Sequence, residues 1–164
     1  RVDLALETVG LRGLEKRAPY TLSGGEKQLL ALAGLLAMDP GYIVLDEATS
    51  SLDPGSKSKV LSILQRLAKQ GIAVVHVTHN MEEALRADRV LLMNKGRIIA
   101  DGAAYEILTQ IDLLKTVGLS PPIIIELMMR LKPWNSALEK PILSVDDAAE
   151  QINAWLRRGC PKAW

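Results

Sequence analysis

Two short apolar segments flank an amphipathic one, and this arrangement restricts the folds that are open to the chain. The segments "YIVLD" (Tyr42–Asp46) and "IAVVHVTH" (residues 72–79) are rich in β-branched residues, which is typical of strands buried in a parallel sheet. Between them, an amphipathic helix is expected over Lys57–Lys69, followed by Gly71 as a C-cap. A strand, a helix and a strand in this order predict a parallel pair in an α/β fold.

The segments on either side of this unit continue the pattern. A helix is expected over residues 1–9, and a longer helix rich in Leu and Ala over Ser23–Met38. After the second strand, the sequence predicts a short helix at residues 80–87. A hairpin follows, formed by "RVLLMN" and "RIIADG" and divided by Lys95–Gly96. Together these elements predict an α/β core with a mixed sheet.

The composition of the chain changes after about Leu108. Prolines divide the remaining residues into two or three predicted helices, and Ser144 is expected to cap the last one. We therefore predict a main domain at residues 1–108 and a small helical C-terminal appendage at residues 109–164. The last helix is expected to bury one apolar face, which comprises Val145, Ala149, Ile152 and Leu156.

Composition and charge exclude several classes of protein. Of the 164 residues, 48% are hydrophobic and 24% are charged, so the chain can bury a core and is not disordered. The net charge of +1 provides no bulk attraction for nucleic acid or anionic lipid. No uncharged apolar stretch is long enough to span a membrane. The single cysteine, Cys160, cannot form an internal disulfide, which fits a reducing compartment.

The segment "TLSGGEKQ" (residues 21–28) has two interpretations. Ser23 and Glu26 stand three positions apart just before an apolar run, which fits a helix-capping box. A serine followed by Gly24 and Gly25 at a helix N-terminus also fits a binding site for a phosphate group. These residues by themselves leave both interpretations open.

Polar residues end both predicted strands, at the sheet edge where ligands bind in open α/β folds. Asp46 and Glu47 end the first strand, and adjacent carboxylates there are costly unless they are paired, hydrated or bound to a cation. One can hold Mg²⁺ while the other orients an attacking water. His79 ends the second strand, where it can hydrogen-bond a phosphate or a catalytic carboxylate. The alternatives are a pair of solvated loop carboxylates and a histidine that caps the helix starting near Asn80.

Two further polar residues have structural interpretations. Asp53 precedes Pro54 in "SSLDPGS", a sequence that is typical of a turn followed by a helix start. His76 falls within the second strand and is expected to belong to the core.

The order and spacing of these segments resemble the C-terminal portion of an ABC-type ATP-binding cassette. Residues 22–26 match its signature motif, residues 42–47 its Walker B motif, and residues 50–53 its D-loop; His79 matches its switch histidine. The resemblance extends over about Val2–Leu108. It implies an incomplete P-loop NTPase-like sheet with a signature-helix subdomain. The tail resembles the helical extension on the ATPases of energy-coupling-factor transporters, which import vitamins and metal ions such as cobalt or nickel.

The resemblance implies catalytic roles at the strand ends. Asp46 would help to hold Mg²⁺, and Glu47 would be the general base that polarises the attacking water. His79 would sense the γ-phosphate of ATP. The function implied is an ATPase subunit of an importer, located peripherally at the cytoplasmic face of the cell membrane.

The resemblance also implies partners. Two cassettes, identical or different, would sandwich two ATP molecules head to tail and drive transmembrane transporter subunits, with no nucleic acid involved. Ser23, Gly24 and Gly25 would contact the γ-phosphate of the ATP held by the other cassette, and Glu26 would belong to the same nucleotide-binding site. Asp53 and its neighbours would cross the dimer interface.

The sequence departs from the family pattern in three respects. Glu26 stands where many members have Gln, and Leu29 stands where an Arg is common. No G-x-x-x-x-G-K-[ST] phosphate loop is present. Because the chain opens at Arg1 directly with helical apolar spacing, we interpret it as beginning partway through a domain. We therefore predict that it needs the missing N-terminal half of its own domain and is inactive alone.

Two alternative functions compete with the importer ATPase. A non-transport ABC ATPase in DNA repair or translation is disfavoured by the neutral charge and by the lack of long coiled coils or paired cassettes. A non-enzymatic interaction module, acting through the tail, is supported by the absent phosphate loop. Association with a membrane complex distinguishes the importer ATPase from the non-transport ATPase.

Overall fold

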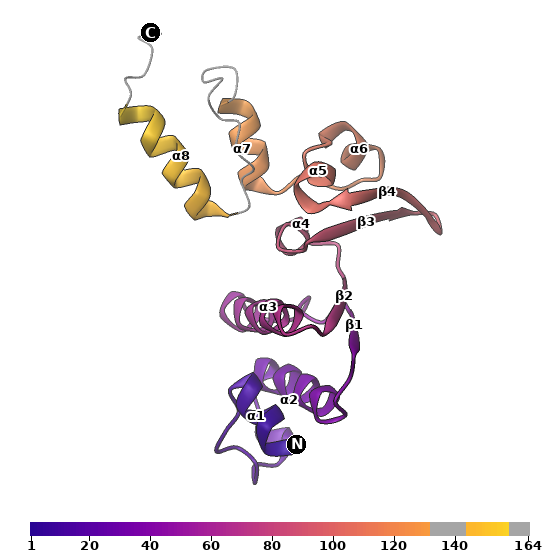
Figure 1. Cartoon of the computed structure of the whole chain (residues 1–164), viewed down its shortest axis with the longest axis vertical. Helices are drawn as coiled ribbons and strands as arrows, with labels where there is room; N and C mark the ends of the chain where they lie inside the picture. The colour runs from indigo at the N-terminus through magenta and orange to yellow at the C-terminus, as the bar shows by residue number, and fades with distance from the viewer. Residues whose placement is uncertain (132–143, 158–164) are drawn as a thin grey trace. The chain divides into compact units, whose positions relative to one another are not determined.

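The computed structural model describes residues 1–131 and 144–157, and it divides into two compact units, Arg1–His79 and Asn80–Trp164 (Figure 1). The described residues combine helices with short strands, so the predicted α/β class is confirmed. The predicted division into residues 1–108 and 109–164 concerns domain organisation and stays a prediction.

The first unit contains the predicted strand–helix–strand arrangement. Its elements are α1 (Val2–Val9), the 3-10 turn η1 (Pro19–Thr21), α2 (Gly24–Ala37), β1 (Tyr42–Asp46), α3 (Pro54–Lys69) and β2 (Ala73–Val77). β1 and β2 form a parallel pair in which Val44 lies opposite Val75. The parallel pair predicted from the sequence is therefore confirmed.

Local sequence signals set the ends of these helices. α1 ends at Gly10, whose φ of 72° is a left-handed conformation that glycine adopts without strain. Ser23 is the N-cap of α2, and Asp53 is the N-cap of α3. The Asp53 side chain accepts hydrogen bonds from the first-turn amides. Since Pro54 occupies the first position of α3, this helix starts three residues before the predicted Lys57.

The core of the first unit lies between its helices and one face of the β1–β2 pair. Leu29, which stands where the resemblance leads one to expect Arg, is only 3% exposed and belongs to this core. An apolar side chain at this position therefore contributes to packing, at about 25 cal/mol per Å² of buried apolar surface. The same core includes Leu6, Val9, Leu32, Ala33, Ile43, Leu45, Val60, Ile63, Leu64 and Leu67.

The two strands are buried on one face only, which corrects the prediction of fully buried strands. Ile43 and Leu45 of β1 point into the core, and alternate residues point to the opposite face. We call this opposite side the outer face; it comprises Tyr42 (72% exposed), Val44 (59%), Val75 (52%) and Val77 (49%). The strands are apolar, as predicted, but within residues 1–79 the packed helices cover a single face.

The second unit combines a hairpin with short helices. Its described elements are α4 (Met81–Ala84), β3 (Arg89–Asn94), β4 (Arg97–Ala103), α5 (Ala104–Leu108), α6 (Ile111–Thr116), α7 (Ile123–Leu131) and α8 (Val145–Arg157). β3 and β4 are antiparallel and meet at Lys95–Gly96, where both residues have positive φ. This is the geometry of a type I′ turn, so the predicted hairpin is confirmed.

The prediction of one mixed sheet is wrong for the described part of the chain. β1 pairs with β2, and β3 pairs with β4, in two separate two-stranded sheets. The hairpin pairs its strands through a two-residue loop and recruits no strand from the first unit. Each of the four strands in the described residues therefore has one edge without a partner strand in its sheet.

The core of the second unit continues across residue 108. Leu108 and Leu114 are both fully buried, although the sequence composition changes between them. The residues that share this core are Leu85, Leu92, Ala104, Ile107, Leu108, Leu114 and Ile125. The change in composition therefore does not coincide with a break in packing.

The last described helix presents a different face from the predicted one. Ser144 caps α8, as predicted, because its Oγ accepts a hydrogen bond of 3.1 Å from the Asp147 amide. Ala148 is buried and packs with Ile152 against Met128 of α7. Of the predicted face, Val145, Ala149 and Leu156 are exposed, because α7 contacts the helix one position away from the stripe read from the sequence.

Candidate functional site

Glu47 and His79, at the ends of two neighbouring strands, contact each other through their side chains. Nδ1 of His79 lies 2.6 Å from Oε1 of Glu47. The parallel register pairs Asp46 with Val77, so both residues follow strand ends at one edge of the β1–β2 pair. The side chains are partly open to solvent, with exposed fractions of 40% for Glu47 and 75% for His79. The structure therefore places the predicted base and the predicted switch histidine together.

The direction of this hydrogen bond follows from the chemistry of an ionised carboxylate. An ionised carboxylate only accepts hydrogen bonds, so Nδ1 of His79 donates to Oε1 of Glu47. The other ring nitrogen, Nε2, does not take part in this bond and can engage a further group. Capping of α4 is performed by Asn80, whose Oδ1 accepts from the amides of Glu82 (3.0 Å) and Glu83 (3.3 Å). The alternative in which His79 caps this helix is therefore wrong.

The backbone of Glu47 is held in an uncommon conformation. Its φ is 50°, in the left-handed region, which costs of order 1–3 kcal/mol for a non-glycine residue. Its N–H donates to the carbonyl of Val77 at 3.0 Å. Its carbonyl accepts from the amide of Ser50 at 3.1 Å and from the Ser50 hydroxyl at 2.9 Å. These bonds on both sides hold the strained turn that aims the Glu47 side chain at His79.

Asp46 is exposed at the end of β1, next to Glu47. Among the described residues, no group of three or more His, Cys, Asp or Glu side chains is arranged to hold a metal ion. Mg²⁺ in nucleotide sites is usually held by one or two carboxylates together with phosphate oxygens and water. Asp46 and Glu47 fit such a shared site, and they do not fit a cage built from protein ligands alone.

The N-terminus of α2 carries the predicted capping box. The Ser23 hydroxyl accepts from the amide of Glu26 at 3.2 Å, and the Glu26 carboxylate accepts from the amide of Ser23 at 2.8 Å. The first-turn amides of Gly24 and Gly25 have no carbonyl partner within the helix. Gly24 is exposed, whereas Gly25 is buried. The capped-helix interpretation is confirmed, and the geometry of a helix N-terminus is compatible with an anion at Gly24.

Hydrogen bonds lower the pKa of two predicted site carboxylates. The pKa of Glu26 is lowered by the Ser23 backbone amide and then by the Ser23 hydroxyl. The pKa of Asp53 is lowered first by the side chain of Ser56 and then by the Ser56 amide. Oδ1 of Asp53 accepts from the amides of Gly55 at 3.0 Å and Ser56 at 3.1 Å. Both carboxylates therefore serve as helix caps, whatever further role they have.

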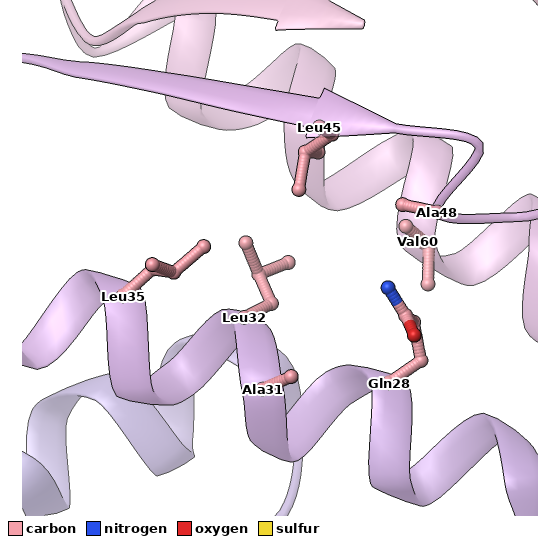
Figure 2. A pocket seen from close by; sticks show the side chains of 7 residues that line it. All are labelled: Gln28, Ala31, Leu32, Leu35, Leu45, Ala48 and Val60. Carbon is pink, nitrogen blue, oxygen red and sulfur yellow. The ribbon is translucent and has the colours of Figure 1, made fainter. Parts of the chain in front are cut away.

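A small cavity lies between α2, β1 and α3. Figure 2 shows side chains of α2 pointing toward Leu45 of β1, with the Gln28 amide directed toward Ala48 and Val60. The cavity has a volume of about 100 Å³, whereas ligand pockets usually enclose about 300–1,000 Å³. Its lining is almost entirely apolar, so it is a packing gap and not a nucleotide pocket. The lining residues are Gln28, Ala31, Leu32, Leu35, Leu45, Ala48 and Val60.

Sequence reasoning missed Ser50 as a contributor to the site. Both its amide and its hydroxyl bond the Glu47 carbonyl. The signal was present in the segment "EATSSLD", because a serine three positions after a residue commonly closes a turn onto its carbonyl. The positive φ of Glu47 had no comparable signal, since glutamate carries no preference for that conformation.

Comparison with known proteins identifies the class. Residues 1–50 match the family model described as ABC transporter. The cobalt import ATP-binding protein CbiO of Syntrophus aciditrophicus is 44% identical over 155 residues, which cover 94% of this chain and 55% of the relative. The energy-coupling factor transporter ATP-binding protein EcfA1 of Clostridioides difficile is 41% identical over 152 residues, or 92% of this chain and 55% of the relative.

A solved structure supports the same assignment. The structure of cbiO1 from Clostridium perfringens, part of the ABC transporter complex cbiONQ, superimposes with a TM-score of 0.64 at 35% identity. The match covers 78% of this chain and 52% of that one.

The chain belongs to the ATP-binding domains of the ABC transporter family and has their mixed α/β fold. The relatives most similar to it include ATP-binding proteins of cobalt and energy-coupling-factor importers. The chain spans about half the length of the curated relatives that it matches. Within residues 1–131 and 144–157, no helix is long and apolar enough to cross a membrane.

Proposed function

We propose that this chain is part of an ATP-binding and ATP-hydrolysing subunit of an ABC importer. The complete protein would couple hydrolysis to the import of a vitamin or a metal ion. The observation that carries the proposal is the 2.6 Å contact between Glu47 and His79 at the strand edge of an ABC-family domain. The names of the relatives, which are ATP-binding proteins of cobalt and energy-coupling-factor importers, support the transport role.

In this proposal the residues at the strand edge divide the chemistry among them. Glu47 takes the proton from the attacking water, and His79 orients the Glu47 carboxylate through Nδ1. With both ring nitrogens protonated, the Nε2–H of His79 would donate to the γ-phosphate. Asp46 would supply an oxygen to Mg²⁺. When bound, Mg²⁺ would neutralise charge that develops on the transferred phosphoryl group. Support for this division of tasks comes from the hydrogen bond between Glu47 and His79 and from the exposed position of Asp46.

A second ATP-binding subunit, identical or different, is the proposed partner across the nucleotide. The N-terminus of α2 would contact the γ-phosphate of ATP held by that subunit, and Asp53 would lie at the interface. The first-turn amides and the helix dipole of α2 support an anion there. The residues proposed for this contact are Ser23, Gly24, Gly25 and Glu26. Transmembrane subunits at the cytoplasmic face of the membrane would complete the importer.

We also propose that the outer face of β1 and β2 is covered by the rest of the ATP-binding domain. Parallel strands are normally buried on both faces. Here the outer face exposes Val44 and Val75, and the chain spans about half of its curated relatives. Residues 1–108 would belong to this domain, and residues 109–164 would form a helical extension. Because the chain lacks a phosphate-loop motif, we expect it to be inactive alone.

The test is ATP turnover by the chain alone and after refolding with a separately made polypeptide that carries the phosphate loop of the same family. Glu47→Gln is the informative variant, and Glu150→Gln, on an exposed position of α8, is its matched control. We expect turnover only in the mixture, lost with Glu47→Gln and retained with Glu150→Gln. Robust Mg²⁺-dependent turnover by the chain alone would contradict the proposal. A folded, associated but inactive mixture would favour a non-enzymatic interaction module.

A further inference from the structure

The N-termini of α2 and α3 lie against each other at Gly25 and Ser56. A Cβ atom added to Gly25 would lie 2.3 Å from the Ser56 hydroxyl and 2.8 Å from the Ser56 Cβ. Both distances are too short for any real side-chain contact, so only glycine fits at position 25 with Ser56 in place. At Gly24, an added Cβ would meet no atom within 4 Å. The two adjacent glycines therefore have different surroundings.

Ser56 also contacts the turn that begins α3. Its amide donates to Oδ1 of Asp53 at 3.1 Å. A hydrogen bond from its side chain is the largest cause that lowers the pKa of Asp53. The same side chain lies against Gly25. Ser56 thus touches the α2 turn with its side chain and the Asp53 turn with both its side chain and its backbone.

We propose that Ser56 is a positioning residue that locks the turn at Ser23–Gly25 to the turn at Asp53, and that position 25 is glycine because of this contact. Gly24 is then the exposed glycine of the pair, and the absence of a side chain at Gly25 leaves space for Ser56. The functional meaning of the coupling rests on the proposed function, because these are the two turns that would face the nucleotide and the partner subunit. The contact itself does not depend on that function.

A graded series of variants tests the contact by thermal unfolding of the 164-residue chain. We expect Gly25→Ala to lower the unfolding midpoint by about 5 °C or more, because overpacking a close contact is destabilising. Gly24→Ala, the matched control, should leave the midpoint within about 2 °C or raise it, since alanine favours helix over glycine. The decrease in the unfolding midpoint caused by Gly25→Ala should be smaller in a Ser56→Ala background. It should be smaller still in a Ser56→Gly background.

This series stays informative if Gly25→Ala alone fails to fold. In that case, recovery of folded protein by the added Ser56→Gly is the expected result, because it removes both atoms that the new methyl group would meet. The proposal would be overturned if Gly25→Ala lowered the unfolding midpoint equally in the unmodified, Ser56→Ala and Ser56→Gly chains. A failure of Ser56→Gly to restore folding would overturn it as well.

A second measurement tests, at Asp53, whether the two turns are coupled through Ser56. Displacing Ser56 with Gly25→Ala should weaken its hydrogen bond to Asp53, so the carboxyl resonance of Asp53 should titrate at a higher pH than in the unmodified chain. Gly24→Ala should leave this titration unchanged. An unchanged Asp53 titration in a folded Gly25→Ala variant would contradict the coupling. Neither measurement uses ATP, so loss of this proposal and loss of the ATPase proposal are distinguishable.

Discussion

Nδ1 of His79 lies 2.6 Å from Oε1 of Glu47, although the two residues are 32 positions apart in the chain. The parallel pairing of β1 with β2 brings their strand ends to one edge. The left-handed backbone of Glu47 then follows β1 directly, in a turn that Ser50 closes. The geometry of the proposed base thus depends on strand register, on a strained turn and on one serine.

If His79 acts through Glu47, their contributions to catalysis should not be additive. In the reconstituted domain, we expect Glu47→Gln to reduce kcat by about 10²–10⁴-fold, the usual range for a general base. Adding His79→Ala to Glu47→Gln should reduce kcat little further, because residues that act as a unit are non-additive. Single-turnover measurements on both single variants and the double variant check this. Fully multiplicative losses would show that the two residues act independently.

The strain at Glu47 predicts a conflict between stability and activity. Glu47→Gly removes the left-handed penalty, so we expect the free energy of unfolding to stay level or rise by up to about 1 kcal/mol. The matched change Asp46→Gly, in regular strand conformation, should lower stability by about 0.5–1 kcal/mol. Urea unfolding followed by circular dichroism measures both. A destabilised Glu47→Gly and a neutral Asp46→Gly would be the opposite of this expectation.

Two leucines of α2 line the same cavity but differ in burial. Leu32 is 3% exposed and Leu35 is 40% exposed. Leu32→Ala should lower the free energy of unfolding by about 2–5 kcal/mol, because it enlarges a cavity inside the core. Leu35→Ala should cost less than about 1 kcal/mol. Chemical denaturation of the two variants provides the comparison, and equal costs would mean that the cavity region is not packed as described.

The capping carboxylates predict sensitivity to acid. The pKa values of Glu26 and Asp53 are lowered from their ordinary values of 4.5 and 3.8. Their stabilising contribution is therefore fully present above those ordinary values and is lost as the pH falls through the lowered values. Combining Glu26→Gln with Asp53→Asn keeps capping oxygens but removes the titration, so stability should fall less steeply below about pH 4.5.

The control for the acid experiment is Glu150→Gln, which removes an exposed carboxylate from α8. Its stability should follow the same pH dependence as the unmodified chain. Unfolding midpoints measured from pH 6 to pH 3, in about half-unit steps, resolve the difference. Identical slopes for the double variant and the control would exclude the caps as the acid-sensitive groups.

The outer face predicts self-association of the chain by itself. Exposed apolar strands with unpaired edges favour association with another copy or with the rest of the domain. We expect Val44→Thr combined with Val75→Thr to shift sedimentation toward monomer. Val2→Thr, which changes an equally apolar exposed position on α1, should leave sedimentation unchanged. A well-behaved monomer of the unmodified chain would contradict this prediction.

Local sequence determined the elements of this protein and their ends. The capping box of Ser23 and Glu26, the Asp53 cap and the left-handed Gly10 each depend on residues within a few positions, so they could be read directly. Strand identity and the shared edge of Glu47 and His79 also followed, because β-branched runs around a helix specify a parallel pair.

Tertiary structure alone decided which faces are covered and how distant turns meet. The outer face stayed exposed because burial depends on what packs against a strand, and apolar composition does not report that. α8 presents Ala148 instead of Ala149 because α7 sets the contact. The crowding of Gly25 by Ser56 arises between two helices separated by a strand. Contacts between elements depend on three-dimensional packing, which neither periodicity nor motif spacing encodes.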